Sequence, residues 1–230
     1  MTQTKTFFIT GTNTGVGKTV LTVLLTEFLR RRRARVAALK PLCSGGRADA
    51  RQLYRALGGS LSLDQINPWY FRAAIAPSAA ARAENKAVRL TTVLQYIRSI
   101  QPTCDLLLVE GAGGLLSPLG ADFNGRDLIS ALDAIPVIVA VNRLGVVNHL
   151  LLTLEALPQS ARRQARIVLM APSRPDSATA LNAGLLQKLA SQPVFLLPRF
   201  DRQTEPGVRL RSPGLRHALE GILHGAPILD

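Results

Sequence analysis

The segment 11–19 limits the possible folds more than any other part of this chain. It reads G-T-N-T-G-V-G-K-T, follows the short apolar run 6–10, and precedes an apolar-rich stretch, 18–32, for which we expect a helix. A glycine-rich turn between a strand and a helix points backbone N–H groups, and the positive end of the helix dipole, toward an anion. The segment therefore predicts a phosphate-binding loop, or P-loop, rather than a chance Gly-Lys-Thr sequence in a turn.

The polar groups of this loop have expected tasks. Lys18 is expected to reach the β- and γ-phosphates of a nucleotide, and the Thr19 hydroxyl to bind Mg²⁺. Five residues separate the first glycine, Gly11, from Gly17, one more than in the common P-loop spacing. The other residues that we expect to contact the nucleotide are Gly15, Val16 and Gly17 in this segment, and Val20 directly after it.

Apolar runs recur along the chain in an order that suits alternating strands and helices. We expect strands at 6–10, 35–39, 106–109, 136–141, 166–170 and 194–197, and a helix that closes over 187–192 before Pro193. Strands that are apolar on both faces are typical of parallel sheets covered on both sides. The prediction is an α/β, P-loop NTPase-like fold, a mostly parallel sheet with helices on both faces, in a single domain 1–230. The tail 201–230, rich in Arg, Gly and Pro, gives no clear pattern.

The charge balance is strongly basic, with 28 Lys and Arg against 15 Asp and Glu. Apart from the run 30–33, the arginines are scattered, and aromatic residues, 5% of the chain, are not interleaved with them. Base stacking has no evident platform, so we expect small anionic partners rather than nucleic acid. Two cysteines do not suggest a disulfide framework, and no run has the pattern of a signal peptide or membrane span. We therefore expect a cytoplasmic protein with no membrane contact.

Further motifs follow the P-loop in a characteristic order. They are Lys40–Gly45 (K-P-L-C-S-G), Asp49, Asn67–Phe71 (N-P-W-Y-F), Ala76–Ser78 (A-P-S), Val109–Gly114 (V-E-G-A-G-G) and Leu144–His149 (L-G-V-V-N-H). Together with the long P-loop, these segments resemble the dethiobiotin synthetase family from about residue 6 to about residue 155. The resemblance is weak beyond that point.

The resemblance implies a ring closure that uses ATP and Mg²⁺. In this family one amine of 7,8-diaminononanoate takes up CO₂ as a carbamate, and ATP phosphorylates the carbamate. The second amine then attacks the mixed anhydride, which closes the cyclic urea of dethiobiotin and leaves ADP and phosphate. The expected partners are therefore small molecules (the diamino acid, CO₂ or bicarbonate, and ATP), and the family also implies a homodimer.

Two lysines suit this chemistry on physical grounds. The carbamate and the γ-phosphate are both anionic and have to approach each other, and Lys18 and Lys40 would offset their repulsion. Both lysines follow apolar strands, which places them at the carboxyl edge of a parallel sheet, where such folds bind ligands. A solvated strand end is the alternative for Lys40. By resemblance, Thr14 contacts the carbamate-bearing end of the substrate and completes the expected catalytic set.

Two acids are candidates to join Thr19 around Mg²⁺, because a hard divalent cation prefers oxygen ligands. Asp49 stands at about the family's position for a metal-binding aspartate. Glu110 ends an apolar strand, where an acid is rarely found without a partner. The alternatives are a helix cap for Asp49 and a helix cap or surface acid for Glu110.

The remaining site residues come from two motifs and one serine. The helix start at 145–148 has free N–H groups that suit the substrate carboxylate, and in the family this site is completed across a homodimer interface. Asn148 is equally consistent with an ordinary N-cap, and Ser44 is consistent with a hydroxyl that only stabilises a turn. We expect no acid–base role for His149. We expect Ser44, Gly145, Val146, Val147 and Asn148 at the substrate. Gly111, Ala112 and Gly113 are expected to bind the cofactor, and Gly113 and its neighbours to form a wall of minimal side chains against nucleotide or substrate.

Recognition of the base departs from the family pattern. Many relatives end the fifth strand with an Asn-Asp pair that reads adenine, whereas this chain has Met170-Ala171-Pro172-Ser173. We expect ATP, with the base read differently, loosely or by backbone groups, and the preference over CTP or GTP stays open. The later segment Pro198, Arg199 and Phe200 resembles the family's cover over the base, where Arg199 or Phe200 would stack.

Other P-loop proteins fit less well. A partitioning-type ATPase has a second lysine near the start of the loop, where this chain has Thr12 and Asn13. A cobyrinate-type amidating synthetase needs an appended glutaminase domain, for which 230 residues leave no room, and a small GTPase needs Asn-Lys-x-Asp where 142–145 reads Asn-Arg-Leu-Gly. A P-loop ATPase or nucleotide-binding regulator of the same fold, without this substrate, stays the alternative.

Overall fold

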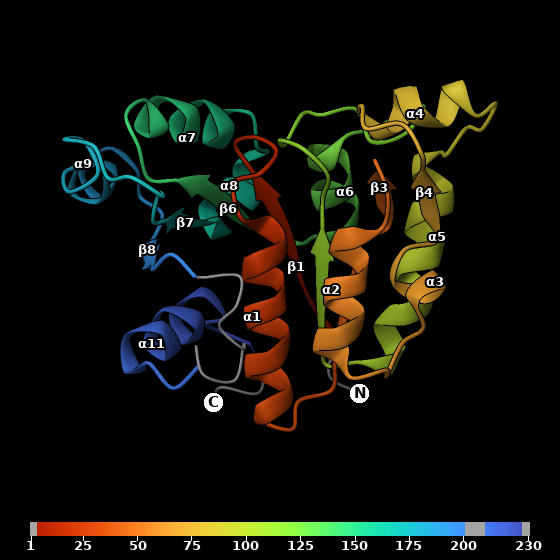
Figure 1. Ribbon diagram of the computed structural model, residues 1–230, viewed down its shortest axis with the longest axis horizontal. Helices are drawn as coiled ribbons and strands as arrows, with labels where there is room; N and C mark the ends of the chain where they lie inside the picture. Colours follow the sequence, from red (N-terminus) through yellow and green to blue (C-terminus); the bar gives the residue numbers. More distant parts are fainter. Residues whose placement is uncertain (1–3, 201–209, 227–230) are drawn as a thin grey trace.

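The computed structural model describes residues 4–200 and 210–226, and within these ranges six strands form one sheet (Figure 1). Their order is β2-β5-β1-β6-β7-β8, and each neighbouring pair is parallel. The predicted α/β fold with a parallel sheet is confirmed. The bounds agree with the predicted strands to within one residue at each end: β1 (Lys5–Gly11), β2 (Val36–Leu39), β5 (Leu106–Glu110), β6 (Ile135–Val141), β7 (Arg166–Met170) and β8 (Val194–Leu197).

Helices cover both faces of the sheet, because successive strand residues point to opposite sides. Phe7 and Ile9 of β1 pack into one hydrophobic cluster, and Phe8, between them, packs into the other. The first cluster also takes side chains from α1 (Lys18–Arg31), α2 (Ala48–Leu57), α3 (Leu63–Ile66) and α11 (Pro213–Ile222). The second takes side chains from α4 (Pro77–Ala83), α5 (Leu90–Ile100), α6 (Gly125–Leu132), α7 (Val146–Glu155), α8 (Gln159–Gln164) and α9 (Asn182–Leu189).

The central position of β1 decides where a ligand can bind. β1 pairs with β5 on one side and with β6 on the other, so the P-loop that follows it lies between the loops that leave these two strands (Figure 1). In a parallel sheet all of these loops meet at the carboxyl edge. The residues after β2 and at the end of β5, together with the start of α7, are thus brought to the same edge as the P-loop.

The structure also has a second, very small sheet, which the sequence analysis did not predict. Its strands, β3 (Leu42–Ser44) and β4 (Trp69–Phe71), are parallel, with Leu42 opposite Trp69 and Ser44 opposite Phe71. Runs of three residues are too short to show a periodicity of two. This sheet starts two residues after Lys40, so it fixes the direction in which the chain leaves β2.

One predicted helix is wrong at its end, and the tail contains a helix that the sequence did not reveal. α9 ends at Leu189, because Ala190 is already extended (φ −123°, ψ 141°), and residues 190–192 are not helical. Pro193, which follows, disfavours helical backbone in the residue before it. In the tail, α11 packs on the α1 side of the sheet. The segments 201–209 and 227–230 of the tail lie outside the described residues.

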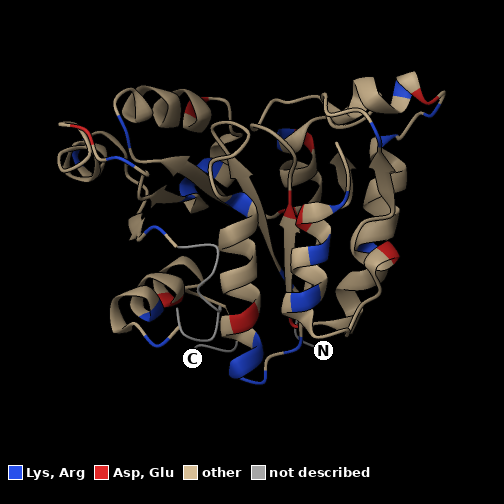
Figure 2. Ribbon diagram, in the orientation of Figure 1, with Lys and Arg blue, Asp and Glu red and all other residues tan. Residues whose placement is uncertain are grey.

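Lys and Arg are distributed over many separate elements in the described part of the chain (Figure 2). Several of them pair with acids at the surface, such as Arg35 with Asp105 and Lys86 with Glu84. In the same ranges, no helix combines the length and the apolar composition that crossing a membrane requires.

Candidate functional site

The P-loop has a backbone that requires glycine. Gly17, the N-cap of α1, has φ 103°, in the left-handed region, and a Cβ there would lie 3.1 Å from Cγ of Met170. Gly15 also has a positive φ of 75°. A side chain at Gly17 would therefore strain the backbone and push against the Met170 side chain at the end of β7. The loop leads directly into α1, as the sequence predicts, so the free N–H groups of the first helical turn face the region that the loop encloses.

Lys18 is a buried cation at the centre of this loop. Its side chain is nearly inaccessible, and Nζ donates a hydrogen bond to the Asn13 carbonyl oxygen over 2.8 Å. Burial, together with the positive charge of Lys40, lowers the pKa of Lys18 to about 8. An anion placed in the loop would relieve both effects, because it supplies the negative charge that the surroundings lack.

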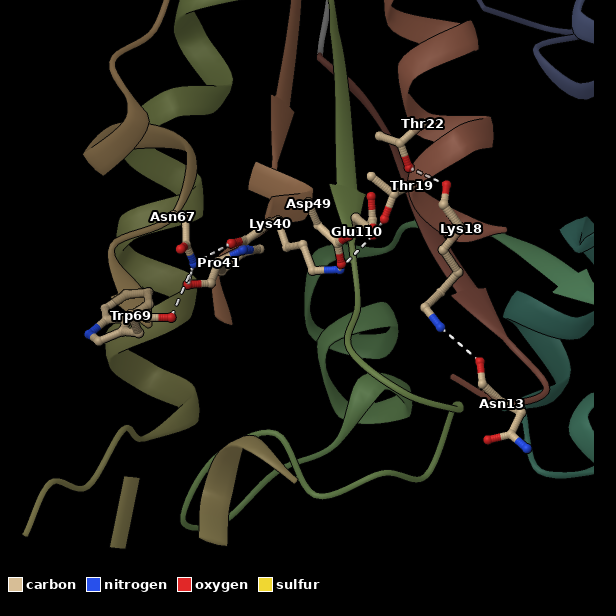
Figure 3. A network of polar contacts seen from close by, with 10 residues as sticks. All are labelled: Asn13, Lys18, Thr19, Thr22, Lys40, Pro41, Asp49, Asn67, Trp69 and Glu110. Carbon is tan, nitrogen blue, oxygen red and sulfur yellow. Dashed lines mark hydrogen bonds and ion pairs between the residues drawn. The ribbon is translucent and has the colours of Figure 1, made fainter. Parts of the chain in front are cut away.

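Four side chains from four different elements meet beside the loop (Figure 3). Lys40 Nζ lies 2.6 Å from Glu110 Oε1 and 2.6 Å from Asp49 Oδ2, and the Thr19 hydroxyl donates to Glu110 Oε1 over 2.6 Å. Lys40 follows β2, Glu110 ends β5, Asp49 lies in the first turn of α2, and Thr19 is the second residue of α1. The structure thus brings Lys40, one of the two lysines assigned to charge neutralisation, together with the three residues assigned to metal binding.

The alternatives that the sequence left open for three of these residues are excluded. Lys40 is 4% exposed, so it is not a solvated strand end, and Glu110, at 1%, is not a surface acid. Arg47 is the N-cap of α2, and no side chain caps that helix, so Asp49 is not a cap.

Burial by itself lowers the pKa of Lys40, but Glu110 and Asp49 outweigh it and raise that pKa above its ordinary value. The two acids therefore favour the charged form of Lys40, whereas burial disfavours the charged form of Lys18.

The oxygen atoms around Glu110 suit a divalent cation. Among the described residues, Glu110 Oε2 is a buried oxygen without a hydrogen-bond partner. An unpaired carboxylate oxygen in the interior is costly, and a hard cation would satisfy it. The Thr19 hydroxyl and the half-buried Asp49 carboxylate add two more oxygen donors nearby. The predicted magnesium ligands therefore fit the ion in type and in mutual proximity.

A cavity of about 420 Å³ lies on the other side of the P-loop, against α7. Thr14, Gly15 and Val16 form its P-loop wall, and Val146, the first residue of α7, faces them. Gly145 is the N-cap of α7, so the predicted helix start is confirmed. Asn148 is the third residue of the helix and is exposed, so its reading as an N-cap is wrong. Gly145, Val147 and Asn148 are not among the lining residues of the cavity.

Several cavity residues were not chosen from the sequence. Three of them, His149, Leu152 and Thr153, follow Val146 at helical spacing on α7, which is the signal that could have revealed them once α7 was assumed. His149, for which only an acid–base role was considered, is one of them. The lining residues that the sequence analysis missed are Thr12, Asn13, Val141, Arg143, His149, Leu152 and Thr153.

The segment that enters α7 is held by a loop far away in sequence. The Asp176 carboxylate accepts a hydrogen bond from the backbone N–H of Leu144 over 2.7 Å. Asn182 Nδ2 donates to Asn142 Oδ1, at 2.9 Å, and both amide side chains are buried. These contacts fix the direction of α7 and hence the position of its first turn at the cavity. The sequence analysis gave no role to any of them.

The glycine-rich segment after β5 runs along the P-loop. The N–H of Gly111 donates to the Ile9 carbonyl oxygen over 2.9 Å, and Ala112 follows it, half-buried. A Cβ on Gly113 would lie 2.4 Å from Oγ of Ser117, so the segment can carry no side chain there. Ser44, in contrast, ends β3 half-buried and does not line the cavity beside α7. Val20 lies in the first turn of α1, half-buried.

The residues expected around the base lie at the ends of β7 and β8. The Ala171 N–H donates to the Leu197 carbonyl oxygen, so residues 171–173 and 198–200 leave the sheet side by side. Pro198 and Arg199 are exposed, while Phe200 is half-buried and packs against the hydrophobic cluster on the α1 side. Their contact with a base, and the base preference itself, stay predictions.

Comparison with known proteins identifies the family to which this chain is similar. The model of a family described as an AAA domain matches residues 5–196. The ATP-dependent dethiobiotin synthetase BioD of Anaeromyxobacter dehalogenans is 39% identical over 92% of this chain and 96% of its own. The enzyme of the same name from Bacillus licheniformis is 35% identical over 83% and 84%. Among solved structures, the signal recognition particle receptor FtsY of Elizabethkingia anophelis matches with a TM-score of 0.51 at 14% identity, over 92% of this chain and 65% of that one, which shows the fold alone.

Proposed function

Because the chain belongs to the ATP-dependent dethiobiotin synthetase family, we propose that it closes the urea ring of dethiobiotin from 7,8-diaminononanoate and CO₂, with ATP as the phosphoryl donor. The observation that carries the proposal is the buried Lys40, held between Glu110 and Asp49 beside the P-loop. This arrangement provides fixed positive charge where two anions have to meet.

In the first half of the reaction, the carbamate oxygen attacks the γ-phosphorus of ATP and the bond to the bridging oxygen breaks, which gives ADP and a carbamic-phosphoric anhydride. Phosphoryl transfer depends mainly on positioning and on neutralising charge. Lys18 serves the nucleotide phosphates, and Lys40 the space between γ-phosphate and carbamate. Because Lys40 is already rigidly paired, little reorganisation is needed when the negative charges approach it.

The acids beside these lysines are proposed to hold magnesium. Thr19, Glu110 and Asp49 are the ligands, and the unpaired Glu110 Oε2 supports this assignment. Bound Mg²⁺ supplies further positive charge for the phosphate oxygens. The Glu110 carboxylate has a second task that needs no metal, which is to orient Lys40 Nζ and the Thr19 hydroxyl at the same time.

In the second half, the free amine of the substrate attacks the anhydride carbon, a C–N bond forms, and phosphate leaves as the amine loses its proton. The cavity between the P-loop and α7 is the proposed place for the diamino acid. Its P-loop wall includes Thr14, which is proposed to contact the carbamate-bearing end. Backbone N–H groups at the start of α7, over 145–148, are proposed for the carboxylate, although that of Val146 already donates to the Arg143 carbonyl oxygen. Ser44 is proposed for a hydrogen bond to the substrate.

A turnover assay with a matched pair of variants tests the proposal. Phosphate release and dethiobiotin formation are measured with ATP, Mg²⁺ and bicarbonate, with and without the diamine. The expected result is diamine-dependent release of phosphate that Lys40→Met lowers by about 100-fold or more. Lys86→Met, which removes an exposed lysine from a surface ion pair, serves as the control and keeps full activity. Phosphate release that ignores the diamine would instead favour a P-loop ATPase without this substrate.

The proposal extends to a homodimer in the cytoplasm. Leu144 and Leu152, beside and within the cavity wall, are 78% and 61% exposed, and exposed apolar side chains next to a binding site favour a contact with another chain. Light scattering of the purified protein tests the dimer, which a monomeric mass would contradict. Cell fractionation tests the location.

A further inference from the structure

Asn67 lies at the point where three segments near Lys40 come together (Figure 3). It is fully buried, and its Nδ2 donates to the carbonyl oxygens of Lys40 and Pro41, at 2.9 and 3.2 Å. The same amide nitrogen donates to the Trp69 carbonyl oxygen over 3.1 Å. Asn67 therefore holds the backbone that carries Lys40 against the first residue of β4.

The opposite end of the same amide reaches the start of α2. Asn67 Oδ1 accepts a hydrogen bond from Nε of Arg47, at 3.1 Å, and Nη2 of Arg47 donates to the Asn67 carbonyl oxygen over 2.9 Å. Arg47 is the N-cap of α2 and stands two residues before Asp49. One side chain thus connects the backbone of Lys40 with the helix start that carries Asp49.

We propose that Asn67 is a positioning residue of the reaction, which sets where the Lys40 ammonium and the Asp49 carboxylate lie relative to each other. The proposal rests on the role given to Lys40 in the proposed function. Asn67 is not a catalytic residue, because its side chain is fully buried and both ends of its amide are already paired with protein groups. It acts through the backbone of Lys40 and through Arg47.

The amide group is what this place requires, rather than a side chain of a certain size. Carbonyl oxygens on one side need a donor, and the Arg47 guanidinium on the other side needs an acceptor. A primary amide provides both in one plane. The Asn67→Asp variant keeps the shape and the acceptor but turns a carboxylate oxygen toward the carbonyl oxygens of Lys40, Pro41 and Trp69, so this segment has to move away.

The consequence of such a movement is a loss of rate rather than of nucleotide affinity. The P-loop lies on β1 and α1 and has no hydrogen bond to Asn67. Binding of ATP without Mg²⁺, which does not depend on Asp49, is therefore expected to change less than about 3-fold. A displacement of a charged group by about 1 Å, in contrast, lowers turnover by about 100-fold. A purely structural role predicts a different pattern, namely a lower melting temperature with the same kcat per folded molecule.

The experiment compares Asn67→Asp with a matched buried amide elsewhere. Gln192→Glu is the control, because Gln192 is also buried and its Nε2 also donates to a carbonyl oxygen, that of Arg162, far from Lys40 in the fold. For both variants we would measure the melting temperature, the Kd for ATP without Mg²⁺, and the KM and kcat of dethiobiotin formation. The expected result is a kcat reduced by about 10- to 100-fold in Asn67→Asp alone, with nearly unchanged Kd. Equal kcat in the two variants would overturn the proposal.

A second variant and a crystal structure keep the proposal testable. If Asn67→Asp does not fold, Arg47→Met removes the partner of Oδ1 from a less buried position, and the same split between kcat and Kd is expected at smaller size. A crystal structure of either variant supplies a readout that does not need the substrate. There the distance from Lys40 Nζ to Asp49 Oδ2, 2.6 Å in the native chain, is expected to increase. An unchanged distance would overturn the role of Asn67, whereas failure of the native enzyme to form dethiobiotin would overturn only the proposed function.

Discussion

Lys40 Nζ and Glu110 Oε1 form an ion pair of 2.6 Å in which the two side chains are 6% and 0% exposed. The pair joins the end of β2 to the end of β5, two strands that are neighbours in the sheet. Buried ion pairs contribute little net stability, because the desolvation of both charges offsets their attraction, but removing one partner leaves an uncompensated charge. This asymmetry leads to the first prediction.

Lys40→Met is expected to lower the free energy of unfolding by about 3–5 kcal/mol, because it leaves the Glu110 carboxylate buried without its cation. The double variant Lys40→Met/Glu110→Gln should lose clearly less than the sum of the two single variants. Urea unfolding of all four proteins measures this coupling. The exposed pair of Lys86 with Glu84 is the matched comparison, with an expected coupling below about 1 kcal/mol. Additive losses at Lys40 and Glu110 would contradict the prediction.

Gly17→Ala is expected to weaken ATP binding by about 10-fold or more. The new Cβ meets Met170 and forces an L-residue into φ 103°, so the loop has to change its shape. Gly184→Ala is the control, since Gly184 lies inside α9 with open space around it, and alanine there should stabilise the chain by about 0.5–1 kcal/mol. Calorimetric titration with ATP separates the two, and equal affinities would show that the loop tolerates a side chain.

Leu152→Asp is expected to raise the KM for the diamino acid by about 10-fold while the affinity for ATP is kept. Leu152 lines the cavity beside α7, and a carboxylate there repels the substrate carboxylate. Leu189→Asp on α9 is the matched control, because the two leucines are equally exposed, at 61% and 60%. Steady-state kinetics, with light scattering to follow the mass of each variant, provide the measurement. An unchanged KM in Leu152→Asp would show that the substrate does not bind in this cavity.

Asp176 should make stability depend on pH in the acid range. The hydrogen bond from the Leu144 N–H, followed by that from the Thr179 hydroxyl, lowers the pKa of Asp176 below its ordinary value of 3.8. A lowered pKa means that the carboxylate stabilises the folded state above about pH 4, and that this contribution is lost as the pH falls through the folded-state pKa. Asp176→Asn should therefore melt below the native chain near pH 6, with a difference that shrinks below about pH 4. A constant difference would exclude this linkage.

Much of the fold could be predicted because its strands are buried on both faces. β6 is a continuous apolar run, β7 is one after its first residue, and β1 has the shorter run Phe7–Ile9; such runs are visible in a single sequence. Lys40 and Glu110 could be placed for the same reason, since a charged residue at the end of an apolar strand lies at the carboxyl edge of the sheet. The parts of the site that depend on strand ends were therefore within reach.

The parts of the site that depend on contacts between residues far apart in the sequence could not be predicted. Asp176 meets Leu144 across 32 positions, and Asn182 meets Asn142 across 40. No local pattern marks a side chain whose partner is chosen by the packing of two loops. The N-P-W-Y-F motif contains Asn67 but does not reveal its hydrogen-bond partners. Its contact with Arg47 depends on how β3, β4 and α2 are arranged in the fold. β3 and β4 were themselves too short to predict.

The place of β1 between β5 and β6 has a consequence for how this enzyme can diversify. Lys40 and Glu110 reach the P-loop from β2 and β5, on one side of it, whereas the cavity is built by β6 and α7, on the other. In the proposed function, the residues for phosphoryl transfer and the residues around the diamino acid therefore lie on separate stretches of chain. If the diamino acid binds in this cavity as proposed, changes in Arg143, His149 or Leu152 alter which substrate is accepted while the groups for phosphoryl transfer stay in place.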